Sequence, residues 1–378
     1  MITQAEQNKD NVLDVARLVA CLSVMLFHFY SRHLDGLTVY PYGDQYNVFI
    51  YGYMGVQFFL MLSGFLIIPS LERTESFLQF VKKKFVRLWM PLLICSIVTF
   101  VFVLLFDTDN IFPESHKFSN FLFSLTFISP FWGSLVLSKS VTYINGSYWF
   151  MGIEVIFLLA CSIIYFANKK HGIRNILMVS VVFHVFHLVT YYCGHRLIIN
   201  YFCNNKFGIP FSAESMSTLS ECLDNWVYPQ YSLYCVFGIV LYLIMQHGMT
   251  SKNVVALGSV LMLYVCQCFV IPASRLLEPW IVLAIALLFG LYIYYRRKAP
   301  SADTDNKPKE WLARLGKTTY TSYLIHETIG VIILHHLAGN MGGYAWGLPI
   351  ILICCALTYG YISYHFIENP IIKLVNRK

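Results

Sequence analysis

Long apolar segments recur along almost the whole chain, and shorter polar segments separate them. Ten of the apolar segments are about 18 to 22 residues long, which is the length that an α-helix needs to cross the hydrocarbon core of a bilayer. These segments are 12–30, 49–70, 88–106, 149–167, 175–193, 226–246, 254–271, 277–295, 318–338 and 345–366. The pattern predicts an all-α integral membrane protein, a bundle of about ten transmembrane helices.

A further apolar segment, 119–138, contains Pro130, Gly133 and several serines. We expect it to lie in the interface or to re-enter the membrane. The basic residues support this choice. With ten spans and the N-terminus inside, most of the 27 Lys and Arg residues fall on the cytoplasmic side, whereas an eleventh span would invert every later loop. We therefore expect both termini to be cytoplasmic.

Composition excludes an ordinary soluble domain, because 57% of the 378 residues are hydrophobic and only 12% are charged. We expect a single membrane domain over 1–378, with a flexible cytoplasmic loop at 296–317 and no soluble domain. The net charge of +7 is not a nucleic-acid signal, because the placement of the charges matters more than their sum, and we expect membrane lipid but no nucleic acid as a partner. The eleven cysteines show no CxxC pair and no Cys/His metal spacing, so we expect no metal site and no permanently bound cofactor.

Three ionisable residues, Asp14, Arg17 and His28, form the first candidate site. Ten residues separate Arg17 from His28, and eleven helical steps of 100° bring their side chains to within about 20° of the same direction. Ionisable side chains on one face of a membrane helix are costly, which favours a functional role. An interfacial ion pair between Asp14 and Arg17, and a packed histidine at position 28, are the structural alternatives.

Two other segments carry polar groups at membrane depth. Glu154 lies about five residues inside 149–167 in apolar surroundings, so its carboxyl group needs a partner from another helix or must be neutral. Ser63 precedes Gly64 in the second apolar segment. For these two residues, close packing of helices is the alternative to a functional role.

The basic run 82–87 precedes the third apolar segment. Lys84 and Arg87 lie three residues apart, so a helix would place them on one face, where they are suited to the phosphates of a cytosolic donor. The alternative is that the run fixes the topology or contacts anionic lipid.

His326 lies about two turns inside 318–338, close to Tyr320 and Tyr323. Imidazole titrates near neutral pH and can act as a general base. Two histidine pairs elsewhere lack such neighbours, and we interpret them as packing or interface residues. They are His184 with His187 and His335 with His336.

Together these motifs resemble the acyltransferase-3 family of bacterial membrane acyltransferases, which are best known for O-acetylating surface glycans. The motifs occur in the family's order and extend over residues 13–370. The matching residues are Leu13-Asp14 with Arg17 and His28, Phe58-Phe59 with Ser63-Gly64-Phe65, Lys84 to Arg87, Trp149 with Glu154, Gly316 to His326, and Tyr364 to Pro370. Lys84 stands where the family usually has an arginine.

The resemblance implies a multi-pass protein of the bacterial inner membrane that transfers an acyl group from cytosolic acyl-CoA, usually acetyl-CoA. The acceptor would be a hydroxyl of a surface or exported glycan or of its lipid-linked precursor. Our hypothesis is that Arg17, Lys84 and Arg87 bind the donor while His28 deprotonates the acceptor hydroxyl or relays the acyl group. Glu154 and His326 would orient or assist. The supporting residues would be Asp14, Ser63, Trp149, Tyr323 and Glu368.

Two other functions explain the intramembrane charges. A transporter or flippase would use the buried Arg, His and Glu side chains as a proton or substrate path. A component of a polysaccharide-export system would retain the helices without acyl-transfer chemistry. Within the enzyme hypothesis, succinyl and longer acyl groups are alternatives to acetyl.

The ten-span topology predicts that the segment after Lys298 is cytoplasmic. A reporter enzyme that is active only outside the cytoplasm should therefore be inactive when fused after Lys298, whereas the same reporter fused after Asn110 should be active. Activity of the Lys298 fusion would contradict the ten-span arrangement.

Overall fold

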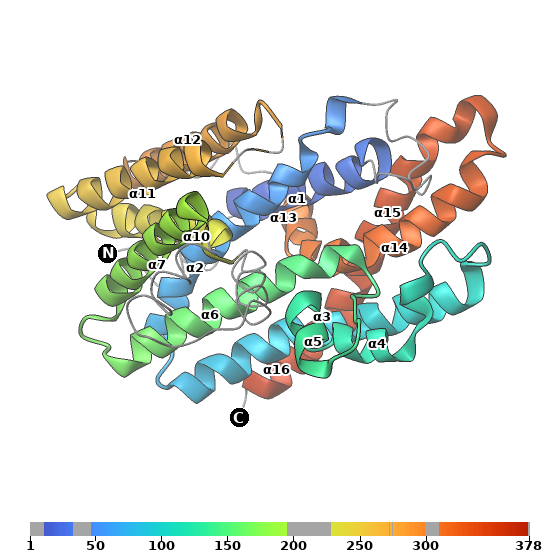
Figure 1. Cartoon of the computed structure of the whole chain (residues 1–378), viewed down its shortest axis with the longest axis horizontal. Helices are drawn as coiled ribbons and strands as arrows, with labels where there is room; N and C mark the ends of the chain where they lie inside the picture. Colours follow the sequence, from blue (N-terminus) through green and yellow to red (C-terminus); the bar gives the residue numbers. More distant parts are fainter. Residues whose placement is uncertain are drawn as a thin grey trace. The chain divides into compact units, whose positions relative to one another are not determined.

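The computed structural model of the chain describes residues 11–32, 47–194, 228–271, 273, 275–298 and 310–376. The chain forms two compact units. The first unit consists of 1–59, 81–152 and 300–378, and the second consists of 60–80 and 153–299. The described residues of both units are helices and connecting turns, without a β-strand (Figure 1).

The first unit is built around helix α14 (Thr319–Ala338), which is buried along most of its length. Helices α1 (Asn11–Leu26) and α15 (Leu348–Ser363) pack against it. The other helices of this unit are α3 (Phe77–Phe106, from residue 81), η2 (Phe27–Ser31), η3 (Asn47–Phe49), η4 (Gly52–Met54), η5 (Pro113–His116), α4 (Phe118–Ser124), α5 (Pro130–Leu137), η6 (Gly146–Tyr148), α13 (Glu310–Gly316), η8 (Gly342–Gly347), η9 (Tyr364–Glu368) and α16 (Asn369–Asn376).

The second unit is built around helix α10 (Tyr228–His247), which contacts α7 (Gly172–Cys193), α11 (Ser251–Val270) and α12 (Glu278–Lys298). It also contains most of α2 (Gly55–Glu72) and of α6 (Trp149–Ala167).

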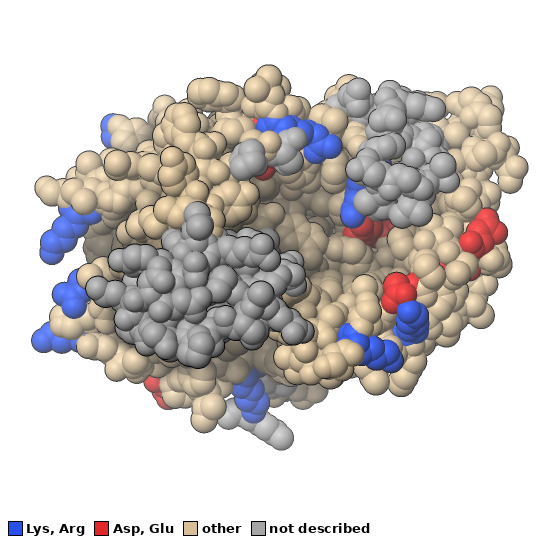
Figure 2. Space-filling model, in the orientation of Figure 1, with Lys and Arg blue, Asp and Glu red and all other residues tan. Residues whose placement is uncertain are grey.

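Eight helical segments of the described residues are long and apolar enough to cross a membrane. They are Asn11–Ser31, Gly52–Glu72, Phe77–Phe106, Gly146–Ala167, Gly172–Cys193, Ser251–Val270, Glu278–Lys298 and Gly342–Leu374. The expectation of an all-α membrane protein is thus confirmed. Charged side chains are also sparse on the face that Figure 2 shows.

Helices α10 and α14 occupy the two remaining predicted spans, and each has 20 residues. Helix α14 carries His326, Glu327, His335 and His336, which makes it less apolar than the eight segments above. Such a sequence is tolerated at membrane depth when neighbouring protein covers it, and α14 is covered in this way. A count of ten spans and the cytoplasmic placement of both termini stay predictions.

The apolar segment 119–138 forms two short helices instead of one long helix. Helices α4 and α5 have seven and eight residues. At 1.5 Å per residue each is about 10 to 12 Å long, much shorter than the hydrocarbon core. These lengths agree with the prediction that segment 119–138 is not a membrane-spanning helix.

Two boundaries differ from the sequence-based expectation. Helix α3 begins at Phe77 instead of residue 88, so the basic run 82–87 is helical. The expected flexible loop 296–317 is wrong at both ends, because α12 continues to Lys298 and α13 forms at Glu310–Gly316. The small residues Ala313 and Gly316 are buried where α13 packs on α1. This contact stabilises the short helix, and composition alone does not reveal it. Residues 299–309 lie outside the described residues.

Helices α2 and α10 approach each other closely in the second unit because two glycines lie at their contact. A Cβ atom on Gly64 would overlap the carbonyl oxygen of Cys235, and one on Gly238 would overlap the carbonyl oxygen of Met61. Packing through small residues is the usual way in which membrane helices come into contact. The packing alternative for Gly64 is therefore supported.

The contact at Gly64 predicts the effect of a single added methyl group. Gly64→Ala should destabilise the protein by about 1 to 3 kcal/mol, because the Cβ has no space beside the Cys235 carbonyl. Thermal unfolding of the purified protein in detergent measures this effect. Gly258→Ala in α11 is the matched control, since no atom lies within 4 Å of the added Cβ, and it should not lower the unfolding temperature.

Candidate active site

The end of the first helix widens into a turn of π-helix, η2, over Phe27–Ser31. The sequence predicted regular α-helix up to residue 30, but the π-turn interrupts that period and changes where the following side chains point. His28 and Phe29 are both buried, and Arg32 follows the turn in an extended conformation. Turns of this kind often occur at functional sites.

His28 lies against His326 of α14. The two rings are stacked, with centroids 4.9 Å apart and an angle of 6° between their planes. His28 Nδ1 is 2.7 Å from His326 Nε2, and the two residues are 6% and 2% exposed. The structure thus brings together two of the three residues that we proposed as catalytic, and it turns His28 towards other ionisable groups.

The hydrogen bonds around this pair assign the protons. His326 Nδ1 lies 2.6 Å from the carbonyl oxygen of Tyr323, which can only accept, so His326 donates from Nδ1 and its Nε2 carries a lone pair. His28 then donates from Nδ1 to His326 Nε2. In the neutral His28 ring, the nitrogen with a lone pair is therefore Nε2. This atom is the site at which His28 can accept a proton.

An ion pair lies beside the two rings. Arg32 donates from Nη1 to Oε1 of Glu327, the residue that follows His326. Arg32 Nη1 is also 3.4 Å from His28 Nε2, and His28 Nδ1 is 4.0 Å from Glu327 Oε2. A guanidinium group next to His28 Nε2 can stabilise negative charge that develops on a reacting group beside that nitrogen.

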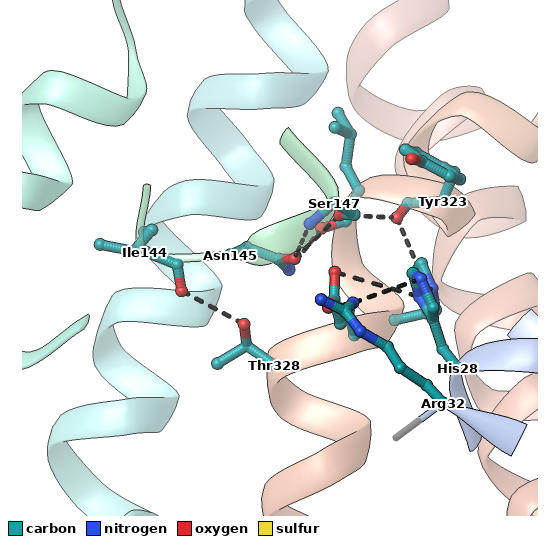
Figure 3. A network of polar contacts seen from close by, with 10 residues as sticks. His28, Arg32, Ile144, Asn145, Ser147, Tyr323 and Thr328 are labelled. Atoms are coloured by element: carbon teal, nitrogen blue, oxygen red, sulfur yellow. Dashed lines mark hydrogen bonds and ion pairs between the residues drawn. The ribbon is translucent and has the colours of Figure 1, made fainter. Parts of the chain in front are cut away.

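A short segment, 144–148, holds the turn of α14 that carries His326 (Figure 3). Asn145 donates to the carbonyl of Leu324 at 3.0 Å, and Ser147 Oγ donates to the carbonyl of Tyr323 at 3.4 Å. The Asn145 side chain also accepts from the backbone N–H of Ser147 at 3.0 Å. Both side chains are fully buried.

Thr328 provides a further bond to this segment, from its Oγ1 to the carbonyl of Ile144 at 3.2 Å (Figure 3). Between Asn145 and Ser147, Gly146 lies against Glu327. A Cβ atom at position 146 would be 2.7 Å from Glu327 Oε1, so only glycine lets the carboxylate approach this closely. The segment therefore positions both His326 and Glu327.

Asp14 and Arg17 form the ion pair that their spacing predicted. Asp14 has a second basic neighbour, since Lys317 Nζ lies 3.7 Å from its Oδ2. Asp14 is buried, whereas the Arg17 side chain is 21% exposed. Arg17 lies eleven residues before His28 on the same helical segment, and Asp14 lies fourteen before it, so this ion pair is separate from the site at His28.

The proposed donor residues on α3 lie at the surface. Arg87 is exposed and Lys84 is partly exposed, and both lie within the helical part of the basic run. Trp149, at the start of α6, is also partly exposed, and its ring contacts Phe150 edge-on. The functional roles of these three residues stay predictions.

Glu154 belongs to the second unit, where it accepts a hydrogen bond of 2.8 Å from Ser63 Oγ. Of the two alternatives for this carboxyl group, the structure shows the partner from another helix, because Ser63 lies on α2. Two of our candidate residues are thus paired with each other. A catalytic role for Glu154 stays a prediction.

Glu368, a proposed supporting residue, accepts two hydrogen bonds inside the first unit. Thr321 Oγ1 of α14 donates to Glu368 Oε1 at 2.6 Å, and Ser363 Oγ donates to the same atom at 2.8 Å. Tyr323, another supporting residue, acts through its backbone, because its carbonyl orients His326. Glu368 therefore anchors α14, and the Tyr323 carbonyl orients the His326 ring on that helix.

Sequence reasoning missed four members of this site, namely Arg32, Glu327, Asn145 and Ser147. Arg32 is four residues after His28, and Glu327 follows His326 directly, so both were visible as charges next to a proposed catalytic residue. Nothing in the sequence signals the role of Asn145 and Ser147, because their partners are backbone groups almost 180 residues away.

Comparison with known proteins places these motifs in a family. The model described as an acyltransferase domain, Acyl_transf_3, matches residues 10–363. The chain is 24% identical over 392 residues to O-acetyltransferase OatA of Staphylococcus aureus strain NCTC 8325, covering 96% of this chain and 57% of that protein.

Two other relatives are similar over different lengths. An O-acetyl transferase of Shigella phage Sf6 is 26% identical over 259 residues, covering 68% of this chain and 69% of the relative. Acyltransferase MdmB of Streptomyces mycarofaciens is 22% identical over 366 residues, covering 86% and 82%. The chain thus spans little more than half the length of the first of these relatives, OatA. No solved structure matches.

Proposed function

Because this chain belongs to the acyltransferase-3 family, we propose that it is a membrane O-acyltransferase. The reaction is the transfer of an acyl group, acetyl in the first instance, from cytosolic acyl-CoA to a hydroxyl group. The acceptor is a surface or exported glycan or its lipid-linked precursor, and the protein acts in the bacterial inner membrane. Relatives that are named O-acetyltransferases support the choice of an oxygen acceptor and an acetyl group.

The observation that carries this proposal is the buried pair of imidazoles. A sugar hydroxyl is a poor nucleophile at neutral pH, so its attack on a thioester requires a base at the reacting oxygen. His28 Nε2 is a lone-pair nitrogen inside a helical protein, and His326 holds the ring in that tautomer through Nδ1. The arrangement resembles the general pattern of a base that a second group orients.

The proposed reaction then proceeds by direct transfer. His28 Nε2 removes the proton of the acceptor hydroxyl as its oxygen attacks the thioester carbonyl carbon. The new C–O bond forms, the C–S bond breaks, and the proton passes from His28 to the leaving CoA thiolate. Arg32, next to Nε2, stabilises the oxyanion of the tetrahedral intermediate, and Glu327 keeps the guanidinium in place.

For the donor, we propose the basic residues at the predicted cytoplasmic surface. CoA is polyanionic and cytosolic, so exposed cations on that side suit its phosphates. Arg87 is exposed on α3 and Lys84 lies three residues before it, and Arg17 is partly exposed on α1. Membrane lipid surrounds the bundle, and we retain an assisting role for Glu154.

The first test of the enzyme is the loss of the base. In membranes that contain the chain, radiolabelled acetyl-CoA should transfer label to the glycan fraction in a bond that mild alkali breaks. His28→Ala should lower this rate by about 10² to 10⁴-fold, the usual contribution of a general base. A flippase or a component without acyl-transfer chemistry would transfer no label at all.

His247→Ala, which removes an exposed imidazole at the end of α10, is the matched control and should retain full transfer.

His326→Ala should lower the rate and alter its pH profile, because His28 loses the group that fixes its tautomer. A His28→Ala protein that folds normally and still acylates at the full rate would contradict the assignment of His28.

The second test concerns the donor. Arg87→Gln should raise KM for acyl-CoA about tenfold and leave kcat nearly unchanged, because a charge-assisted phosphate contact made before the chemical step is lost. Arg174→Gln removes an exposed arginine from α7 on the same predicted side and should leave KM unchanged. Equal KM values for the two variants would remove Arg87 from the donor site.

A further inference from the structure

The first unit contains a second cluster of ionisable side chains, separate from the candidate active site. Asp109 follows α3, while His335 and His336 lie in the last turn of α14. His335 Nε2 is 3.0 Å from Asp109 Oδ2, and His336 Nδ1 is 3.8 Å from the same oxygen. His335 is nine residues after His326, about 14 Å along the helix.

The turn that carries Asp109 is held in place by a neighbouring carboxylate. Asp107 accepts from the backbone N–H of Ile111 at 2.8 Å, from that of Phe112 at 3.0 Å, and from His116 Nε2 at 2.9 Å. Ile111 and Phe112 pack against a fully buried residue of α14, Val331. Asp109 is therefore presented to α14 by a fixed turn.

The hydrogen bonds of His336 determine what its other nitrogen can do. Nε2 lies 3.0 Å from the carbonyl of Phe106, so it donates a proton to that oxygen. In the neutral ring, Nδ1 then has a lone pair that faces the Asp109 carboxylate. Two electron-rich atoms that face each other favour a cation or a proton between them.

We propose that Asp109, His335 and His336 bind a divalent transition-metal ion, Zn²⁺ in the first instance. One donor atom from each residue lies within 4.8 Å of the other two, so small side-chain movements bring all three to ligand distances of about 2.0 to 2.2 Å around one ion. Two imidazoles and one carboxylate are a usual ligand set for zinc.

Two features of the surroundings support this assignment. The Phe106 carbonyl is the kind of partner that orients a metal-binding histidine through its second nitrogen. The C-terminal end of α14 adds partial negative charge from its last carbonyl groups, which favours a cation. The side chains are 29% to 56% exposed, so an ion can reach them and a water molecule can fill the fourth position.

The ion would join the turn after α3 to the end of α14, the helix that carries His326. It would stabilise this contact and would take no part in the reaction. From the sequence we expected no metal site and interpreted His335 and His336 as packing or interface residues. Spacing could not indicate the site, because its third ligand lies 226 residues from His335.

The test uses the full-length protein without an affinity tag, purified in detergent and treated with a chelator. Titration with Zn²⁺ against a competing chromogenic chelator should show one site in the wild-type protein. Asp109→Ala, His335→Ala and His336→Ala should each weaken the affinity at least tenfold, about the loss expected for disturbing a metal site. Saturating Zn²⁺ should raise the unfolding temperature of the wild type only.

His247→Ala is the control and should bind as the wild type does. Co²⁺ distinguishes this site from the free cysteines, several of which are exposed, because thiolate ligands give a sulfur-to-cobalt charge-transfer band that imidazole and carboxylate ligands lack. Zn²⁺ binding of equal affinity in His335→Ala and wild type would overturn the proposal. So would an unfolding temperature that depends on pH and on Asp109 but not on the metal, since a proton would then fill the gap.

Discussion

The contact between η2, which continues α1, and α14 at His28 and His326 is the interaction on which the rest of the first unit depends. Burying two imidazoles and an ion pair inside helices is costly, and the cost is offset only if each polar atom has a partner. Arg32 and Glu327 neutralise each other, and His326 donates to the Tyr323 carbonyl. A network of this kind has one low-energy arrangement, which keeps the lone pair of His28 at Nε2.

The surrounding elements maintain that arrangement from three directions. Segment 144–148 binds the backbone of α14 at Leu324 and Tyr323. Glu368 binds the same helix one turn earlier, at Thr321, and Gly146 leaves room for the Glu327 carboxylate. These contacts use buried polar side chains where apolar ones would pack equally well, and they fix the rotation of α14 about its axis.

The sequence predicted those features that follow from local residue patterns and from the cost of placing polar groups in a membrane. The lengths of the apolar segments predicted the helices, and the i, i+3 spacing of Asp14 and Arg17 predicted their ion pair. The isolation of Glu154 predicted either a partner from another helix or a neutral carboxyl group, and Ser63 is such a partner. Contacts between segments that are distant in the sequence could not be predicted in this way. The π-turn at Phe27–Ser31 could not be predicted either, because no periodic pattern of residues marks it. Their positions in apolar segments selected His28 and His326 as candidates, but only the fold pairs them.

The depth of His326 shows why the fold was needed. If depth is counted from residue 318, where the predicted span begins, His326 would lie near the cytoplasmic end of that span. His28, in contrast, lies near the other end of the helical segment Asn11–Ser31. Cys21 Sγ, however, contacts the carbonyl of Thr319 at 3.6 Å, and this contact has the same separation of 298 residues as the contact of His28 with His326.

Equal separations mean that α1 and α14 run parallel and in register over at least two turns, with Thr319 at the level of Cys21. Helix α13 packs on α1 and ends with Gly316 against the backbone of Asp14, and α14 begins three residues later at Thr319. The short helix that composition did not reveal therefore sets the register of the two histidines. A chain that entered α14 directly at the level of Asp14 would place His326 about two turns away from His28.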